Sequence, residues 1–334
     1  MARREIVLLR EPEIRSLLDA ASCIGAVEAA FAASATAHAK TPGVIHLDIP
    51  DHSGEIHIKA GYLDGGGVYA LKAASSFPGN PALGLPASDG LVMVFDATTG
   101  APEALLLDGG FITDLRTAAA GAVAAKHLSR AAIETVGVVG AGIQCRLQVE
   151  LLGQVRGFRE LRIWGRDPEH ARAAASDLTR SAKLPPGVRV QAVGSVEEAA
   201  GDADVLFTVT ASRRPLVRSE WLKEGSLVVA VGADAEDKRE LFPDVLARAD
   251  RVVADSVSQC RAIGEIHHAV AAGALVVSEV VELGEIAAGL QPGRRTEQER
   301  IVCDLTGLGI QDAAAAGLVL ERARERGVGE RFLG

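Results

Sequence analysis

Three charged residues stand in apolar stretches of the chain and have side chains that could carry chemistry. Lys72 lies in the strand-like run LKAAS, and burying a lysine is costly unless its ammonium meets an anion. We predict Arg116 in the first turn of a helix, where a cation is disfavoured; a guanidinium there could bind a carboxylate through two hydrogen bonds. Asp234 follows an apolar run, where its carboxylate could exchange protons with a substrate amine or imine.

Each of these residues also has a purely structural interpretation. Lys72 could lie on the solvent face of an edge strand, and the same ambiguity applies to Lys59. Arg116 could form a surface pair with Asp114, and Asp234 could cap a helix or belong to a loop. The spacing of the residues does not separate these alternatives.

A glycine-containing turn between a strand and a helix predicts a dinucleotide site. The apolar run TVGVV at residues 135–139 precedes this turn. The turn and the start of the helix consist of Gly140, Ala141, Gly142, Ile143 and Gln144. Glycines let the backbone turn sharply and approach a pyrophosphate, which then sits on the free N–H groups of the helix. Cys145 replaces the third glycine of the usual motif, so the prediction also depends on the strands that follow.

The end of the next strand bears on the identity of the cofactor. An acidic residue at this position usually bonds the ribose hydroxyls of NAD. Here the strand ends at Gly165 and Arg166 follows, which favours the 2′-phosphate of NADP, while Asp167 keeps NAD as the alternative. Further residues expected to bind the cofactor lie in or after later strands: Thr208, Thr210, Val231 and Gly232.

These residues must be positioned by two different kinds of sheet. Strands alternate with helical patterns in the middle of the chain, which is typical of a parallel sheet with helices on both faces. We expect its strands at residues 135–139, 161–164, 189–193, 205–210, 227–231 and 251–254, and a helix at 168–182. Ser195 and Glu198 have the spacing of a helix capping box.

The first hundred residues instead show the apolar–polar alternation of half-buried strands in an antiparallel or mixed sheet. We expect helices at residues 12–40 and 113–128, and strands at 45–49, 55–60, 68–73, 91–95 and 104–107. After about residue 290 we expect a loop and a last helix beyond Asp312. The predicted fold is therefore α/β: a Rossmann-type domain over 121–304, and an α+β domain built from both chain ends, 1–120 and 305–334.

Composition excludes several classes of protein. The formal net charge of −9 argues against nonspecific binding to nucleic acid, which needs a basic excess. The sequence contains no apolar run long enough to span a membrane and no secretory signal, so we expect a cytoplasmic protein. The four cysteines and the adjacent pair His267 and His268 lack metal-ligand spacing, and His46 and His57 read as structural groups; no metal site is predicted.

Taken together, these features resemble the ornithine cyclodeaminase/mu-crystallin family. The matching stretches follow one another along nearly the whole chain. They are residues 56–62, 79–86, 113–121, 139–144, 231–234 with Lys238, Glu240 and Leu241, and 306–312. The resemblance implies a homodimer whose α+β domain binds a small amino or imino acid and forms the dimer contact. It also implies that Lys72 and Arg116 hold the substrate carboxylate, that the glycine turn holds the pyrophosphate, that Asp234 acts near the nicotinamide, and that Thr306 lies near the substrate.

One position departs from the pattern of the family. Cyclodeaminases carry an arginine before the first strand as a further carboxylate ligand, and Val44 stands there in this chain. Either Lys59 compensates or the pocket suits another substrate. We therefore favour a ketimine reductase or amino-acid dehydrogenase, with Asp234 and Lys72 as catalytic residues. Cyclodeamination of ornithine or lysine, in which Glu55 could hold the side-chain amine, is the first alternative, and a non-catalytic NADPH-binding protein is the second.

Overall fold

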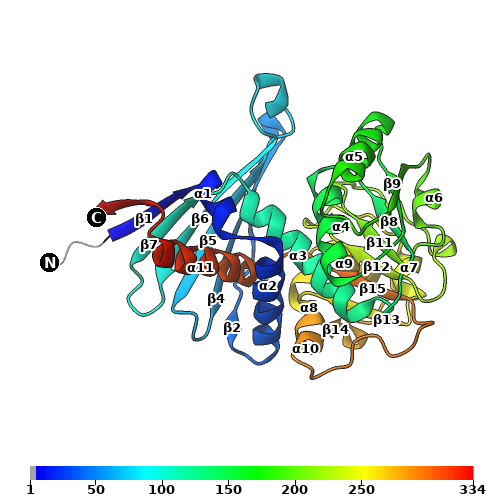
Figure 1. Ribbon diagram of the computed structural model, residues 1–334. Coiled ribbons are helices and arrows are strands. Elements are labelled where there is room, and N and C mark those ends of the chain that lie inside the picture. Colours follow the sequence, from blue (N-terminus) through cyan, green and yellow to red (C-terminus); the bar gives the residue numbers. More distant parts are fainter. Residues whose placement is uncertain (1–4, 334) are drawn as a thin grey trace. The chain divides into compact units, whose positions relative to one another are not determined.

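The structure is a computed structural model that describes residues 5–333, and it divides into two compact units (Figure 1). The first unit extends to Arg116 and resumes at Leu308, while the second spans Thr117–Gly307. Both ends of the chain therefore contribute to the same unit. Helix α3 (Phe111–Leu128) begins in the first unit and continues into the second.

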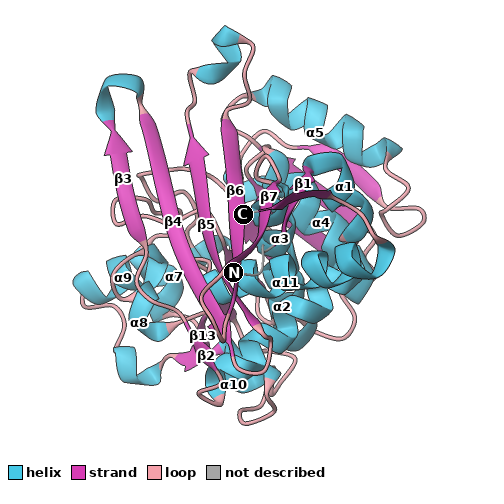
Figure 2. Ribbon diagram, turned by 90° about the vertical axis from the view of Figure 1, so that its left-hand side faces the viewer, coloured by secondary structure: helices cyan, strands magenta, loops and turns pink. Residues whose placement is uncertain are grey.

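The first unit is built on an eight-stranded mixed sheet, whose long central strands are visible in Figure 2. Its strands are β1 (Glu5–Arg10), β2 (Ala39–Lys40), β3 (Ile45–Ile49), β4 (Gly54–Leu63), β5 (Val68–Ser76), β6 (Ser88–Asp96), β7 (Pro102–Leu107) and β16 (Glu330–Leu333). The order is β16-β1-β7-β6-β5-β4-β2, with β3 paired to β4. Among the strands that the structure describes in this sheet, β1 and β7 alone pair in parallel. The antiparallel strands alternate their side chains between two faces, as the sequence predicts.

Three helices accompany this sheet: α1 (Glu11–Leu17), α2 (Ala20–Ala35) and α11 (Gly309–Arg326). Short 3-10 turns, η1 (Pro50–His52) and η2 (Asn80–Leu83), follow β3 and β5. Helix α11 packs on β4 and β5, and its first residue touches the backbone of β4. A Cβ added to Gly309 would overlap the backbone of Ala60, and one added to Gly61 would overlap Gly309. This close approach brings the first turn of α11 next to the middle of β4.

The second unit is an eight-stranded sheet in which every pairing is parallel. Its strands are β8 (Thr135–Val139), β9 (Glu160–Trp164), β10 (Arg189–Ala192), β11 (Val205–Thr208), β12 (Leu227–Ala230), β13 (Arg251–Ala254), β14 (Val281–Glu282) and β15 (Ile301–Asp304). Its helical segments are α4 (Ile143–Val155), α5 (Pro168–Arg180), α6 (Val196–Ala200), α7 (Pro243–Ala247), α8 (Val257–Cys260), α9 (Gly264–Ala271) and α10 (Leu283–Ala287), with 3-10 turns η3 (Ser219–Trp221) and η4 (Val277–Glu279).

The strand order β10-β9-β8-β11-β12-β15-β13-β14 begins as the dinucleotide-binding fold does, with the first strand next to the second on one side and the fourth on the other. Strands β8, β11, β12, β13 and β15 are buried along their whole length, which explains their nearly continuous apolar sequences. The predicted α/β fold is confirmed.

Two strands of this sheet were not predicted, the two-residue β14 at its edge and β15 in its interior. We assigned no strand between the loop expected after about residue 290 and the last helix, whereas β15 occupies the sheet between β12 and β13. The run IVCD is short, and its strand character comes from burial between two neighbours rather than from any alternation. The last helix also begins earlier than expected, at Gly309, and therefore contains Asp312.

The predicted helix starts have the expected chemistry. The Ser195 hydroxyl accepts a hydrogen bond from the Glu198 amide at 3.1 Å, and the Asp167 carboxylate accepts one from the Glu169 amide at 2.9 Å. Within residues 5–333, no single helix is long and apolar enough to cross a membrane. The bent pair α1 and α2, with 79° between them, passes that test by length and composition only.

Candidate functional site

Lys72 and Arg116 meet at one buried carboxylate in the first unit. The Lys72 Nζ lies 3.1 Å from Asp312 Oδ2, and the Arg116 Nε donates to Asp312 Oδ1 at 2.9 Å. Arg116 also donates through Nη1 to the side-chain oxygen of Gln311 at 2.8 Å. All of these side chains are almost fully buried. The two cations that the sequence singled out are therefore neighbours inside the protein, not solvent-facing groups.

The fold explains why both cations are buried. Lys72 lies on β5, which has β4 on one side and β6 on the other, so the interpretation as an edge-strand lysine is wrong. Arg116 is bonded to the last helix, so the interpretation as a surface pair with Asp114 is also wrong. The predicted first-turn position is wrong as well. Helix α3 begins at Phe111, which places Arg116 in its second turn.

Lys59 adds a third positive side chain to this cluster. It lies directly opposite Lys72 in the β4–β5 register and is 5% exposed. Residues that are opposite each other in an antiparallel pair project from the same face of the sheet. Lys59, Lys72 and Arg116 are thus buried near one another, and the positive charge of each acts on the Asp312 carboxylate.

This crowding changes the protonation of the groups. Burial is the largest cause that lowers the pKa of Lys72 from 10.5 to about 7; the Arg116 charge lowers it further, and Asp312 opposes the change. The charges of Arg116, Lys72 and Lys59 lower the pKa of Asp312, although burial, the largest single effect on it, opposes them. Burial raises the pKa of Asp108, which also interacts electrostatically with Lys72. An anionic ligand in this cluster would favour the protonated form of Lys72.

In the second unit, the glycine turn after β8 has the backbone geometry that a close-approach turn requires. Gly140 has φ +126°, and a Cβ there would lie 2.7 Å from a Val209 methyl carbon. A Cβ on Gly142 would meet nothing within 4 Å. Gly142 is the N-cap of α4 and makes no side-chain cap, so the first amides of the helix remain available to an anion. The turn therefore fits a cofactor pyrophosphate.

A cleft of about 340 Å³ lies beside this turn. Its lining includes six of the residues that concern the cofactor: Gly140, Ala141, Gly142, Arg166, Asp167 and Thr210. The rest of the predicted set lies outside this lining. Ile143 is 53% exposed, and Thr208 is fully buried in β11. Gln144 accepts a 3.3 Å hydrogen bond from Gln148, which holds its side chain along α4.

Glu240, to which the sequence assigned no role, holds two of the predicted cofactor-binding loops. Its carboxylate accepts hydrogen bonds from the backbone amides of Thr210 at 2.5 Å and Gly232 at 2.9 Å, which follow β11 and β12. Burial raises the pKa of Glu240 to about 7, and these hydrogen bonds oppose the rise. Glu265 in turn accepts from the amides of Glu240 and Leu241. No local signal in the sequence pointed to this role, because Glu240 ends the charged run EDKRE, which is typical of an exposed loop.

Asp234 lies in the same loop region, after β12. Its side chain is 40% exposed and is paired with the Lys238 Nζ at 2.9 Å. Lys238 is itself 6% exposed, and its backbone oxygen lies 2.9 Å from the His268 Nε2. Val231, also predicted to bind the cofactor, is 9% exposed at the end of this strand. Asp234 is therefore a partly exposed carboxylate held beside a buried lysine.

Thr306 is buried in a network of its own. Its hydroxyl donates to Asp255 Oδ1 at 3.0 Å and accepts from the Gln259 side-chain amide at 2.9 Å. The other Asp255 oxygen accepts from the Gly307 amide at 2.7 Å. These contacts fix the segment that leads from β15 to α11. Glu55, the remaining predicted site residue, lies on β4 beside two histidines.

Comparison with known families and structures agrees with this geometry. A model of the ornithine cyclodeaminase/mu-crystallin family matches residues 4–327. The chain is 43% identical over 331 residues to an uncharacterized cyclodeaminase, y4tK, of Sinorhizobium fredii, which covers 97% of this chain and 98% of the relative. It is 36% identical over 333 residues to the alanine dehydrogenase of Archaeoglobus fulgidus, which covers 98% of both.

A solved structure is also similar over the full length. It is the Thermococcus litoralis Delta(1)-pyrroline-2-carboxylate reductase, in complex with NADH and L-proline. The TM-score is 0.91 with 32% sequence identity, and the match covers 98% of this chain and 100% of the other. The similarity therefore includes both units and is not limited to the nucleotide-binding sheet.

Proposed function

The chain belongs to the ornithine cyclodeaminase/mu-crystallin family, and from this premise we propose that it is an NAD(P)-dependent oxidoreductase of a small amino or imino acid. The reaction would be that of a ketimine reductase or amino-acid dehydrogenase. The observation that carries the proposal is that Lys72 and Arg116 both form buried ion pairs with Asp312. Lys59 lies beside Lys72 on the neighbouring strand. A buried cluster of three cationic side chains is suited to binding a ligand carboxylate.

In this proposal the three cations bind the substrate carboxylate and so orient its α-carbon. Arg116 already uses its Nε and Nη1 on Asp312 and Gln311, which fixes the plane of its guanidinium before a ligand arrives. Lys59 supplies the charge that the family arginine supplies elsewhere, because Val44 occupies that position. Fixing the carboxylate lowers the entropic cost of reaching the reactive geometry.

The bound nicotinamide would supply or take up a hydride at the α-carbon. We assign to Asp234 the proton that moves on and off the substrate nitrogen. Its accessible carboxylate and its pairing with Lys238 support this role. Thr306 is assigned to the edge of the substrate site, where Asp255 and Gln259 orient its hydroxyl.

We favour NADP over NAD as the cofactor. The Asp167 carboxylate is engaged as the N-cap of α5, which makes it a poorer partner for ribose hydroxyls. Arg166 and His170 both line the cleft at this end, and both can carry a positive charge toward a 2′-phosphate. The Thermococcus relative was solved with NADH, so NAD is the alternative that direct measurement must test.

We further propose that the protein is a cytoplasmic homodimer in which the first unit carries the substrate site and the dimer contact. The four cysteines support a reducing compartment, because all are buried and none forms a disulfide within the described residues. Size-exclusion chromatography with light scattering would test the dimer; a monomer at micromolar concentration would contradict it.

Cyclodeamination is the second candidate, and the similarity to the cyclodeaminase y4tK supports it. The assay that separates the two supplies cyclic imines, or pyruvate with ammonia, together with NADPH or NADH, and follows cofactor oxidation. A parallel reaction supplies L-ornithine or L-lysine with catalytic oxidised cofactor and measures ammonia and the cyclic amino acid. We expect net reduction. Efficient ornithine turnover without net cofactor change would reverse the assignment, and cofactor binding without any turnover would favour a storage protein.

A further inference from the structure

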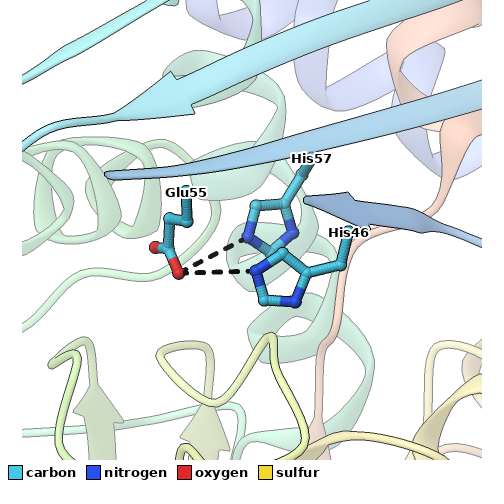
Figure 3. A group of neighbouring side chains, drawn as sticks. All are labelled: His46, Glu55 and His57. Carbon is cyan, nitrogen blue, oxygen red and sulfur yellow. Dashed lines mark ion pairs between the residues drawn. The ribbon is translucent and has the colours of Figure 1, made fainter. Parts of the chain in front are cut away.

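Two histidines and a glutamate converge on the first unit's sheet in a way that the sequence did not predict (Figure 3). His46 lies on β3, and Glu55 and His57 lie on β4. The Nε2 atoms of both histidines are 3.8 Å from the same Glu55 oxygen, Oε2. The ligand atoms of the three side chains all lie within 4.8 Å of one another.

The strand register creates this cluster. His46 is directly opposite His57, and Asp48 is directly opposite Glu55 in the β3–β4 pair. Because alternate residues share a face, all four side chains project from one side of this two-stranded ribbon. The two imidazole rings stack with their centroids 4.5 Å apart and their planes at 23°. Separations of two residues along a strand, unlike helical spacings, do not suggest a ligand set by themselves, so the sequence alone predicts no metal here.

One nitrogen of the cluster lacks a hydrogen bond. Among the residues that the structure describes, the His57 Nε2 is buried and has no hydrogen-bond partner. The Glu55 oxygen at 3.8 Å is too far for a hydrogen bond but is at a distance that an ion between the two groups could bridge. Buried polar atoms without a partner are rare in proteins, and such an atom beside a carboxylate can mark the binding position of an ion.

From this geometry we propose that His46, Glu55 and His57 form a binding site for a divalent transition-metal ion, with Zn²⁺ the best fit. Two imidazole nitrogens and one carboxylate are typical zinc ligands, whereas Mg²⁺ and Ca²⁺ prefer oxygen alone. Asp48, whose carboxylate is 3.4 Å from the His46 Nε2, is available as a fourth ligand.

The site needs only a small contraction to bind the ion. With bonds of about 2.0–2.1 Å, tetrahedral ligand atoms lie roughly 3.4 Å apart. The two separations from the Glu55 oxygen are larger, 3.8 Å each, and all three ligand atoms lie within 4.8 Å of one another. β3 can move to bring the ligand atoms closer, because among the described strands it pairs with β4 alone and the His46 side chain is 33% exposed. A bound ion would thus tie an edge strand to the sheet.

The site also lies on the face of the sheet that carries the cationic cluster. Glu55, His57 and Lys59 alternate along β4, and Lys72 is opposite Lys59. The spacing of a strand puts His57 about 7 Å along the chain from Lys59. The ion would therefore be a neighbour of the proposed substrate carboxylate site, although the proposal for the ion does not depend on the reaction.

The test uses tag-free, full-length protein treated with a chelator and then dialysed. Isothermal titration with Zn²⁺ should give one ion per chain with micromolar or tighter affinity, and Co²⁺ should give the visible absorption of a tetrahedral site with nitrogen ligands. Zn²⁺ should also raise the melting temperature. The His46→Ala and His57→Ala variants should each bind Zn²⁺ at least tenfold more weakly and lose the cobalt spectrum.

His52→Ala is the matched control, because His52 is an exposed histidine in the η1 turn that joins the same two strands. It should bind like the unmodified protein. Absence of stoichiometric Zn²⁺ binding would overturn the proposal, as would equal weakening in all three variants, which would indicate adventitious surface histidines. His46 is on an exposed edge strand, so its variant should fold even if His57→Ala does not, and circular dichroism checks this for each protein.

Discussion

Arg116 donates a hydrogen bond to Asp312 at 2.9 Å although 196 positions separate them in the chain. The contact joins the second turn of α3 to the first turn of α11 inside the first unit. Since Lys72 binds the other oxygen of the same carboxylate, Asp312 organises both cations of the proposed carboxylate site. The acid is buried in a position where its loss would leave two positive charges without their nearest counter-charge.

We expect Asp312→Asn to destabilise the protein strongly. Removing one partner of a buried ion pair leaves an uncompensated buried charge, which typically costs about 3–5 kcal/mol of unfolding free energy. Urea denaturation followed by circular dichroism measures the change. Asp51→Asn, at an exposed position in η1, is the control and should change the unfolding free energy by less than about 0.5 kcal/mol. Similar stabilities for the two variants would show that Asp312 is not needed to balance the cations.

Substrate affinity should depend on pH through Lys72. Its pKa is lowered to about 7, so the free enzyme loses this positive charge as the pH rises through about 7. A carboxylate ligand prefers the protonated lysine and raises its pKa, so 1/KM should fall above pH 7, by up to about tenfold per pH unit. Steady-state kinetics from pH 6 to pH 9 measures this.

The Lys72→Met variant is the control for that profile. It should bind substrate weakly and lose the fall of 1/KM near pH 7, while it keeps any contribution from Glu240, whose pKa is also about 7. A profile that is identical in the two proteins would assign the titration to another group.

Asp234→Asn should abolish most of the activity without affecting the fold. Asparagine retains the size of the side chain and can accept from Lys238, but it cannot take up a proton, and loss of a general acid/base typically costs about 10²–10⁴-fold in kcat. Cofactor affinity, measured by fluorescence titration, should be unchanged. Asp237→Asn alters an exposed carboxylate three positions away that pairs with Arg213, and it should retain normal kcat. Equal activity in both variants would remove Asp234 from the mechanism.

The two glycines of the turn after β8 should respond differently to alanine. Gly140→Ala places a Cβ at φ +126° and 2.7 Å from Val209, so it should both lower the melting temperature and weaken cofactor binding. Gly142→Ala has an ordinary φ of −80° and free space around the Cβ, so it should keep the melting temperature. The added methyl group should weaken cofactor binding alone. Thermal melts with and without cofactor distinguish the two effects, and a melting temperature for Gly140→Ala equal to the unmodified one would contradict this interpretation.

Local patterns were sufficient to predict most of the fold. The alternation in residues 45–49 and 55–60 and the apolar runs before each helix correspond to β3, β4 and the parallel strands. The glycine turn could be placed because its requirement is local: a positive φ directly after a buried strand. Lys72 and Arg116 could be selected because a charge among apolar residues implies a partner.

The partners themselves could not be predicted, because they come from distant parts of the chain. Asp312 lies in the last helix and Glu240 lies in a loop, and neither has a sequence neighbour that suggests its bonds. The strand β15 was missed for a related reason, since four buried residues carry no periodicity. The convergence of His46 and His57 depends on the β3–β4 register, which is fixed only when the hairpin forms.

The position of β15 has a consequence for how the protein is made. This strand completes the parallel sheet between β12 and β13, yet it is the last of that sheet's strands to leave the ribosome. The first unit is likewise incomplete until α11 and β16 have been synthesised. Neither unit can close its core while the nascent chain is shorter than about 300 residues, so both must reach their final structure almost together, at the end of synthesis. A premature stop between β14 and β15 would leave both sheets incomplete, with unpaired strand edges that favour aggregation.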